Sequence, residues 1–256
     1  MFRNAPEMWT ARQMVESGEL GEVETINVYG AGGKQMSGQG CQQFAEAFMF
    51  AGDSEIAWVV GAVDGEPGDS ELGTIDEWSD HDQGLAFGFV QFKNGITVHL
   101  HKYVGTKEGV EVLGTKGALF ISQKRIGKVW HKDGSDLKRV GSLFPFPDPG
   151  DAALKRNYDD EGWEVQSTRL IQSVNAFIDS VDSGAPVKCS GADLHKALEL
   201  AISLRESHRC GTTRVSLPLE DWELKIIHSG RRRIGRRALT GTEAFIASVK
   251  VLKWGD

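Results

Sequence analysis

His99 and His101 are the first residues whose type and spacing could do chemistry. Residues two apart on a β-strand point to the same face, so this pair could ligate a metal ion, and His81 could add a third group. Zinc and iron sites need three or four converging ligands, and one His-x-His pair supplies only two. We therefore expect no metal and place both histidines on a polar or interface face of an antiparallel sheet. A metal site at His81, His99 and His101 is kept as the lesser alternative.

A glycine run, Gly30-Ala31-Gly32-Gly33, follows a predicted strand and could cradle a phosphate. The dinucleotide-binding fingerprint requires a third glycine in a set place and a helix that begins at once, and both are missing from this run. The sequence also contains no Gly-Lys-Ser/Thr triplet. We expect this chain to bind no nucleotide cofactor by itself.

Cysteine chemistry offers one candidate nucleophile. Cys41 stands at the start of a predicted helix, where the helix dipole would lower the pKa of a thiol, but a structural role as a small hydrophobic residue is the favoured interpretation. No Gly-x-Ser-x-Gly elbow is present. Three cysteines, Cys41, Cys189 and Cys210, are an odd number without metal spacing, which predicts reduced thiols and a cytoplasmic location.

Composition and charge exclude several classes of protein. Of 256 residues, 40% are hydrophobic and 25% charged, which is typical of a globular chain and not of a disordered or coiled-coil one. No apolar run is long enough to predict a membrane span, and the N-terminus lacks the apolar core of a signal peptide. Residues 229–256 carry seven basic and two acidic side chains, so residues 1–228 hold 22 basic and 34 acidic ones. An acidic body argues against nucleic acid as a partner.

The elements that must position these residues follow from hydrophobic periodicity. Helices are predicted over residues 6–17 and 42–51, from Leu170 to a stop at Gly184, and from a Ser190/Asp193 capping box to Gly211. The apolar side of this last helix is Leu194, Leu198, Ala201, Ile202 and Leu204. Strands are predicted at 22–29, 56–63, 85–92, 96–103, 110–113, 118–122 and 128–131, with short extended pieces at 215–219 and 222–227.

The order of these elements predicts an α+β fold. Asn94-Gly95 is a strong hairpin signal, and the strands after it are too closely spaced for crossover helices, which indicates antiparallel pairing. Residues 64–82 hold eight acidic side chains and no basic one, which predicts a solvated loop. We expect one domain over residues 1–228, with helices covering one face of an open, largely antiparallel sheet, and a basic extension over 229–256.

Several segments, taken in order, resemble the second domain of the glucose–fructose oxidoreductase / inositol dehydrogenase family (Gfo/Idh/MocA). Residues 11–23 are similar to the family's passage of helix, glycine and strand that follows its nucleotide-binding domain. Further pieces resemble its helix-to-strand step, its sheet, and its closing helix and strand, at residues 50–61, 92–95, 112–119, 190–207 and 215–219.

The resemblance implies an oxidoreductase that works in two halves. In the family, an N-terminal Rossmann domain holds NAD or NADP and supplies a Glu-Lys-Pro lysine. The second domain has an open, largely antiparallel sheet, shapes the sugar or polyol pocket and provides the subunit interface, and it commonly supplies an Asp/His pair that handles the proton. The nucleotide-binding half is not in this sequence, because Met1 falls just before the first helix of the second domain.

The family's Asp-x-Gly-x-His motif is altered in this chain. The sequence reads Gly38-Gln39-Gly40-Cys41-Gln42, so Gln42 stands at the His position and Gly38 at the Asp position. A glutamine hydrogen-bonds a hydroxyl but exchanges no proton near neutral pH. We name Gln42, Gln43 and Gln39 as candidate substrate-binding residues and expect no catalysis by this chain alone. The resemblance implies a homo-oligomer formed through the sheet face. The alternative is a non-catalytic carbohydrate-binding or dimerisation module.

Overall fold

The computed structural model describes residues 6–31, 36, 40–64, 77–79, 84–102, 108–122, 127–133, 138–140, 173–187, 189–220, 225–227, 231–234 and 237–240. Gly38, Gln39 and His81 lie outside these ranges. No helix in the described part of the chain is long and apolar enough to cross a membrane.

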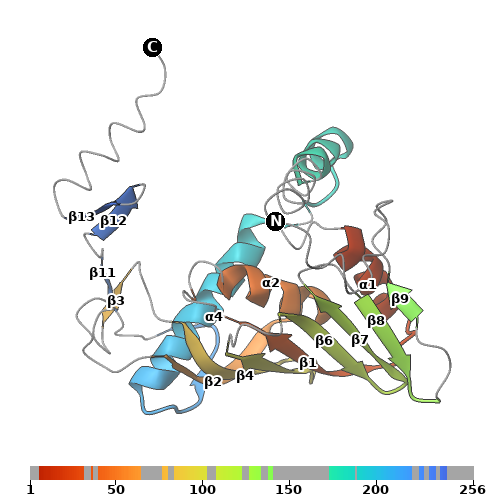
Figure 1. Ribbon diagram of the computed structural model, residues 1–256, viewed down its shortest axis with the longest axis horizontal. Helices are drawn as coiled ribbons and strands as arrows, with labels where there is room; N and C mark the ends of the chain where they lie inside the picture. Colours follow the sequence, from red (N-terminus) through yellow and green to blue (C-terminus); the bar gives the residue numbers. More distant parts are fainter. Residues whose placement is uncertain are drawn as a thin grey trace.

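One sheet of nine strands, among the residues described, forms the base of the molecule (Figure 1). Its spatial order is β10-β2-β4-β5-β1-β6-β7-β8-β9. The strands are β1 (Val23–Tyr29), β2 (Ile56–Val63), β4 (Leu85–Phe92), β5 (Thr97–His101), β6 (Gly109–Gly114), β7 (Gly117–Ser122), β8 (Gly127–His131), β9 (Lys138–Val140) and β10 (Val215–Ser216). Neighbours pair antiparallel except β1 and β5, which run parallel. The open, largely antiparallel sheet is confirmed.

The helices lie on one face of this sheet, as predicted. They are α1 (Pro6–Glu16), α2 (Cys41–Phe50), an unlabelled helix over residues 173–183 and α4 (Gly191–Arg209). α4 packs on β2 and on α2, and α2 also contacts β1. The helix over 173–183, drawn in teal, stands on the same side of the sheet but rises away from it (Figure 1).

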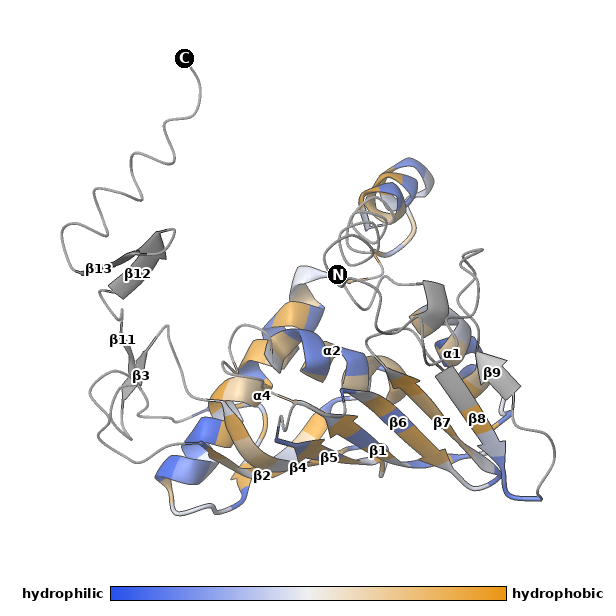
Figure 2. Cartoon of the chain, viewed as in Figure 1, coloured by the Kyte–Doolittle hydropathy of each residue, from blue (hydrophilic) through white to orange (hydrophobic). Residues whose placement is uncertain are grey.

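Alternation along the strands sends one set of side chains into the core. Ile26 and Val28 of β1, like Val98 and Leu100 of β5, are almost fully buried. They meet the apolar side of the helices, which includes Phe44, Phe48 and Leu204. Figure 2 shows these apolar stripes along strands and helices. The other set of side chains forms the sheet face turned away from the helices, hereafter the open face.

Local signals in the sequence set the ends of the elements. Gly95, in the hairpin between β4 and β5, has φ +92°, which suits glycine. The capping box at α4 is present in full. The Asp193 N–H donates to the Ser190 Oγ at 3.2 Å, and the Ser190 N–H donates to the Asp193 carboxylate at 2.7 Å.

The apolar side of α4 differs from the prediction in its first half. Ala201, Ile202 and Leu204 are buried, but Leu194 is 48% and Leu198 38% exposed. Burial along α4 begins only at Ala197. The first turns of α4 therefore present apolar side chains to solvent.

Two small two-stranded sheets complete the fold. β3 (Glu77–Ser79) pairs in parallel with β11 (Lys225–Ile227), so the prediction of a loop over 64–82 is wrong for these three residues. Local composition could not reveal a partner strand so far along the chain. β12 (Arg231–Ile234) and β13 (Arg237–Thr240) form an antiparallel pair inside the predicted basic extension. The boundary at residue 228 stays a prediction.

Candidate functional site

The first turn of α2 carries two of the candidate glutamines, Gln42 and Gln43, on the helix side of the sheet. Gln42 is exposed there. Gln43 beside it is only 1% exposed, and Cys41 is 8% exposed. Gly40 caps the helix with no side-chain hydrogen bond to its first turn. Of the candidate glutamines that the structure describes, Gln42 alone presents its side chain to solvent.

Packing on both sides holds α2 in place. Phe48 meets Phe92 of β4 edge to face, with ring centroids 5.8 Å apart. Past its C-terminus, the Asp53 carboxylate accepts a 2.8 Å hydrogen bond from the Arg12 guanidinium of α1. The Asp53 carbonyl accepts a 3.3 Å hydrogen bond from Lys196 Nζ of α4. The helix that presents Gln42 is thus tied to both neighbouring helices.

Three polar side chains of α2 and α4 are buried. Gln43 and Glu46 of α2, and Arg205 of α4, are each 2% exposed or less. Because its side chain is buried, Gln43 is not exposed to a ligand in the way that Gln42 is.

The histidine pair lies on the open face, on the side opposite α2. His99 and His101 of β5 point the same way, with ring centroids 6.4 Å apart. Among the described residues, no group of three or more His, Cys, Asp or Glu could hold a metal ion.

These histidines belong to a row of rings that crosses the open face, hereafter the aromatic row. Trp58 stacks on Phe89, Phe89 meets His99, and His101 stacks on Tyr29, which meets Phe120, with centroid distances of 4.8–6.3 Å. The Arg214 guanidinium lies 4.7 Å from the Trp58 ring and extends the row. A row of mostly half-buried rings of this extent is the chemistry of an interface or of a sugar-stacking platform.

A carboxylate network lies inside the aromatic row. Glu111 of β6 accepts hydrogen bonds from Tyr29 Oη at 2.8 Å and from Asn27 Nδ2 at 3.1 Å, and Asn27 Oδ1 lies 3.3 Å from His101 Nε2. Burial and the bond to Glu111 together raise the pKa of Tyr29 to about 12. This cluster was not predicted from the sequence. Its only signal is strand alternation, which puts Asn27 and Tyr29 on one face once the register against β6 is known.

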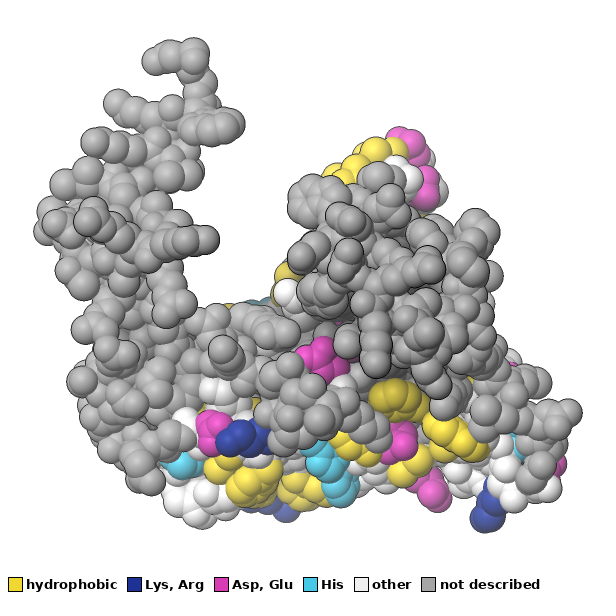
Figure 3. All heavy atoms as spheres, viewed as in Figure 1, with side chains coloured by type: hydrophobic (Ala, Val, Ile, Leu, Met, Phe, Trp, Pro, Cys, Tyr) yellow, Lys and Arg dark blue, Asp and Glu magenta, His cyan; other side chains and the backbone are white. Residues whose placement is uncertain are grey.

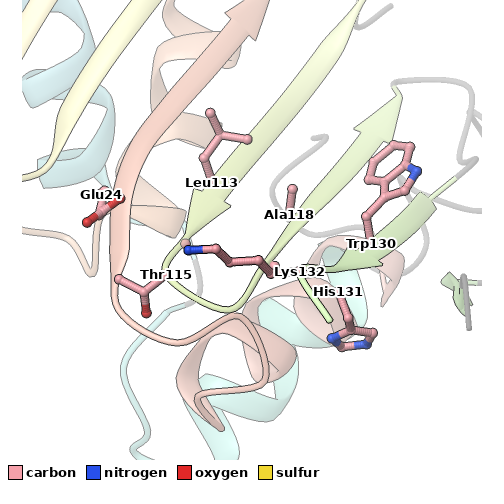
Figure 4. Close-up of a pocket in the computed structure, with 9 residues that line it drawn as sticks. Glu24, Leu113, Thr115, Ala118, Trp130, His131 and Lys132 are labelled. Atoms are coloured by element: carbon pink, nitrogen blue, oxygen red, sulfur yellow. The ribbon is translucent and has the colours of Figure 1, made fainter. Parts of the chain in front are cut away.

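A pocket of about 390 Å³ opens near the strand ends of β6, β7 and β8. Ala118 lies between the larger side chains Leu113 and Trp130, with Lys132 and Glu24 at the rim (Figure 4). Trp130 is 39% exposed. Because the side chains of Glu24, Leu113 and Trp130 belong to the open face, the sheet separates this pocket from Gln42.

The glycine run does not fit a dinucleotide where it is described. The Ala31 N–H donates a 3.0 Å hydrogen bond to the His101 carbonyl, which extends the pairing of β1 with β5. That N–H group is therefore not available to a phosphate, and we derive no step of hydride transfer through these residues.

Comparison with known proteins reveals the fold. No family model and no curated protein matches the chain. Among solved structures, it is similar to a levoglucosan dehydrogenase in complex with NADH and levoglucosan (TM-score 0.61, 17% identity, 85% of this chain and 65% of that one). It is also similar to an inositol dehydrogenase homolog from Azotobacter vinelandii in complex with NAD+ (0.58, 14%, 84% and 63%). A third is an oxidoreductase from Agrobacterium radiobacter in complex with NAD+, L-tartaric acid and magnesium (0.56, 19%, 84% and 63%).

The match covers a larger share of this chain than of the solved proteins. Most of this chain is covered, but it spans less than two thirds of each of those proteins. The resemblance drawn from the sequence motifs is confirmed at the level of the fold. The chain has the α+β sheet-domain fold of the Gfo/Idh/MocA-type oxidoreductases.

Proposed function

We propose that this chain is the substrate-binding and self-associating half of an NAD(P)-dependent oxidoreductase that acts on a sugar, a polyol or a related carbinol. The observation that carries the proposal is the shared fold, which covers 84–85% of this chain in proteins solved with NADH and levoglucosan or with NADH and myo-inositol. A nucleotide-binding domain, in the same polypeptide or in another, would bring the nicotinamide. The reduced thiols of Cys41, Cys189 and Cys210 favour a cytoplasmic setting.

Gln42 has a defined part in this proposal. Its amide donates to one substrate hydroxyl and accepts from another, which orients the carbinol without removing its proton. The proton of the carbinol hydroxyl would then pass to a base that lies outside the first turn of α2. Gln39 and Gln43 stay in the proposal as neighbours, with Gln43 acting through the packing of α2.

The experiment measures binding of myo-inositol and levoglucosan, by ligand-observed NMR, to the chain assembled with its nucleotide-binding domain. We expect Gln42→Ala to weaken binding about tenfold, the worth of one well-placed polar contact. Gln13→Ala, which alters an exposed glutamine on α1, is the matched control and leaves binding unchanged. Equal binding by the Gln42 variant and the parent would remove Gln42 from the site.

Self-association through the open face is the second part of the proposal. The aromatic row and the exposed Phe87 (49%) and Trp130 (39%) form the surface that a second copy would cover. Sedimentation should show a dimer or larger assembly that Phe87→Asp dissociates. Phe177→Asp, which places the same charge at a similarly exposed site on the helix over 173–183, should leave the association between copies of this chain intact. A parent protein that sediments as a monomer at micromolar concentration contradicts this part.

One alternative function has an observation in its favour. A side chain that exchanges no proton at position 42, together with the aromatic row, suits a non-catalytic module that binds carbohydrate or dimerises. NAD(P)-dependent oxidation of a polyol by the assembled protein would exclude this alternative.

A further inference from the structure

Exposed apolar side chains are concentrated in one short stretch of the described chain. Nine large hydrophobic residues are exposed in the described part of the chain, and seven of them fall between Val174 and Leu198. The other two, Phe87 and Trp130, belong to the open face. Large exposed apolar patches on a folded domain mark surfaces that meet another protein surface.

The helix over 173–183 carries the larger part of this patch. Val174, Phe177, Ile178 and Val181 follow the spacing of a single helical stripe and are 48–65% exposed. Figure 3 shows hydrophobic side chains uncovered at the outer end of this helix, beside acidic ones. A stripe of this pattern is built to pack against a partner, yet here it is turned to solvent.

The first turns of α4 continue the patch. Leu194 and Leu198 are one helical turn apart and are exposed, whereas α4, which packs on β2 and α2, is buried continuously from Leu200 to Ser207. Only seven residues, 184–190, connect the two helices, so both exposed surfaces belong to the same region of the fold. We call this surface, Val174, Phe177, Ile178, Val181, Leu194 and Leu198, the helix patch.

We propose that the helix patch is the docking surface for the nucleotide-binding domain that completes the oxidoreductase, an inference that rests on the function proposed above. The solved neighbours extend over a third of their length beyond the part matched by this chain, and the three described above hold NAD+ or NADH. Hydride transfer requires the nicotinamide to approach the substrate beside α2, which lies on the helix side of the sheet. The helix over 173–183 projects from that same side (Figure 1), whereas a second copy would occupy the open face.

The test is site-specific photocrosslinking in cells that make the protein naturally. p-Benzoylphenylalanine replaces Phe177 in one variant and Phe87 in another, and the crosslinked peptides are sequenced by mass spectrometry. We expect the probe at 177 to crosslink to a domain that carries a dinucleotide-binding fingerprint. A crosslink within one polypeptide shows that the domain precedes this chain, and a crosslink between polypeptides shows that it is a separate subunit. The probe at 87 should crosslink to a second copy.

A second variant tests the patch without relying on the probe's own position. With the probe at Val181, Phe177→Asp should lower the yield of that adduct about tenfold or more, because a charge in the centre of an apolar interface removes a principal contact. Phe87→Asp should leave the yield within about twofold. The Phe177 side chain is 56% exposed, so its replacement leaves the core of the domain intact.

Several outcomes would overturn the proposal. They are an adduct at 177 with a second copy of this chain, an adduct with a protein that lacks a nucleotide-binding domain, and no adduct at 177. Failure of the proposed function looks different, because the adduct would form while the complex oxidises no polyol with NAD(P). A complex that oxidises polyols yet gives no adduct at 177 retains the function and refutes the docking surface.

Discussion

Tyr29 Oη donates a 2.8 Å hydrogen bond to the Glu111 carboxylate across the open face of the sheet. The same carboxylate accepts from Asn27, and the Tyr29 ring stacks on His101 with centroids 4.8 Å apart. The phenol is therefore fixed at both its ring and its hydroxyl.

This contact predicts a stability change at alkaline pH. Burial, together with the bond to Glu111, raises the pKa of Tyr29 from 10.0 to about 12, so the folded state keeps its proton where the unfolded state releases it. Stability from this group is fully present below pH 10 and is lost as the pH rises from 10 toward 12. Urea unfolding should show that the free energy of unfolding falls from pH 9 to pH 11, and that this fall is smaller in Tyr29→Phe than in the parent protein.

An absorbance titration supplies the control. The chain has three tyrosines, and Tyr29→Phe should remove an ionisation with a pKa of about 12. If the variant and the parent lose the same stability between pH 9 and 11, Tyr29 is not the group responsible.

Gly61 of β2 leaves room for α4 to approach the sheet. A Cβ there would lie 2.5 Å from Leu204 Cδ2 and 2.9 Å from the Phe87 carbonyl oxygen, so Gly61→Ala forces the helix or the strand to move. We expect a loss of about 1–3 kcal/mol in the free energy of unfolding, measured in urea. Gly191→Ala, at the first residue of α4, meets nothing within 4 Å and should cost nothing or stabilise slightly. Equal stability of the two variants would refute the close approach.

Short-range chemistry explains why much of the fold was predictable. Asn94-Gly95 and the Ser190/Asp193 capping box act over two to four residues, so the sequence displays both partners together. The exposure of Leu194 was not predictable, because hydrophobic spacing identifies an apolar stripe but not what lies against it. The parallel pairing of β1 with β5 also depends on a strand from another part of the chain.

The candidate site, like the fold, was predictable only in part. The family motif singled out Gln42 and Gln43 together, and only the packing of α2 on α4 separates the exposed one from the buried one. The Tyr29–Glu111 bond required the register of β1 against β6, which pairs Asn27 with Glu111. A set of side chains on one sheet face becomes visible only when the order of the strands is known.

The capping box at α4 gives a prediction about the helix that links the core to the helix patch. Ser190→Ala removes the acceptor for the Asp193 N–H and should cost about 1 kcal/mol in unfolding free energy. Ser190→Gly, which leaves the N–H groups open to water, should cost only a few tenths. Identical losses in the two variants would mean that the hydroxyl contributes through another contact.

His208, near the end of α4, predicts a stability change in the acidic range. Burial, reinforced by the positive charge of Arg205, lowers the pKa of His208 below 6.5. Its Nδ1 is buried with no hydrogen-bond partner in the structure as described, so no acceptor compensates a proton there. The unfolded state therefore binds the proton more readily. Stability from this group is complete above pH 6.5 and declines as the pH falls toward the folded pKa.

His208→Gln, which does not titrate, should lose less stability between pH 7 and 5 than the parent protein in urea unfolding. His195→Gln, on the exposed side of α4, is the matched control and should lose as much stability as the parent protein. If His195→Gln loses less stability and His208→Gln does not, His208 is not the group responsible.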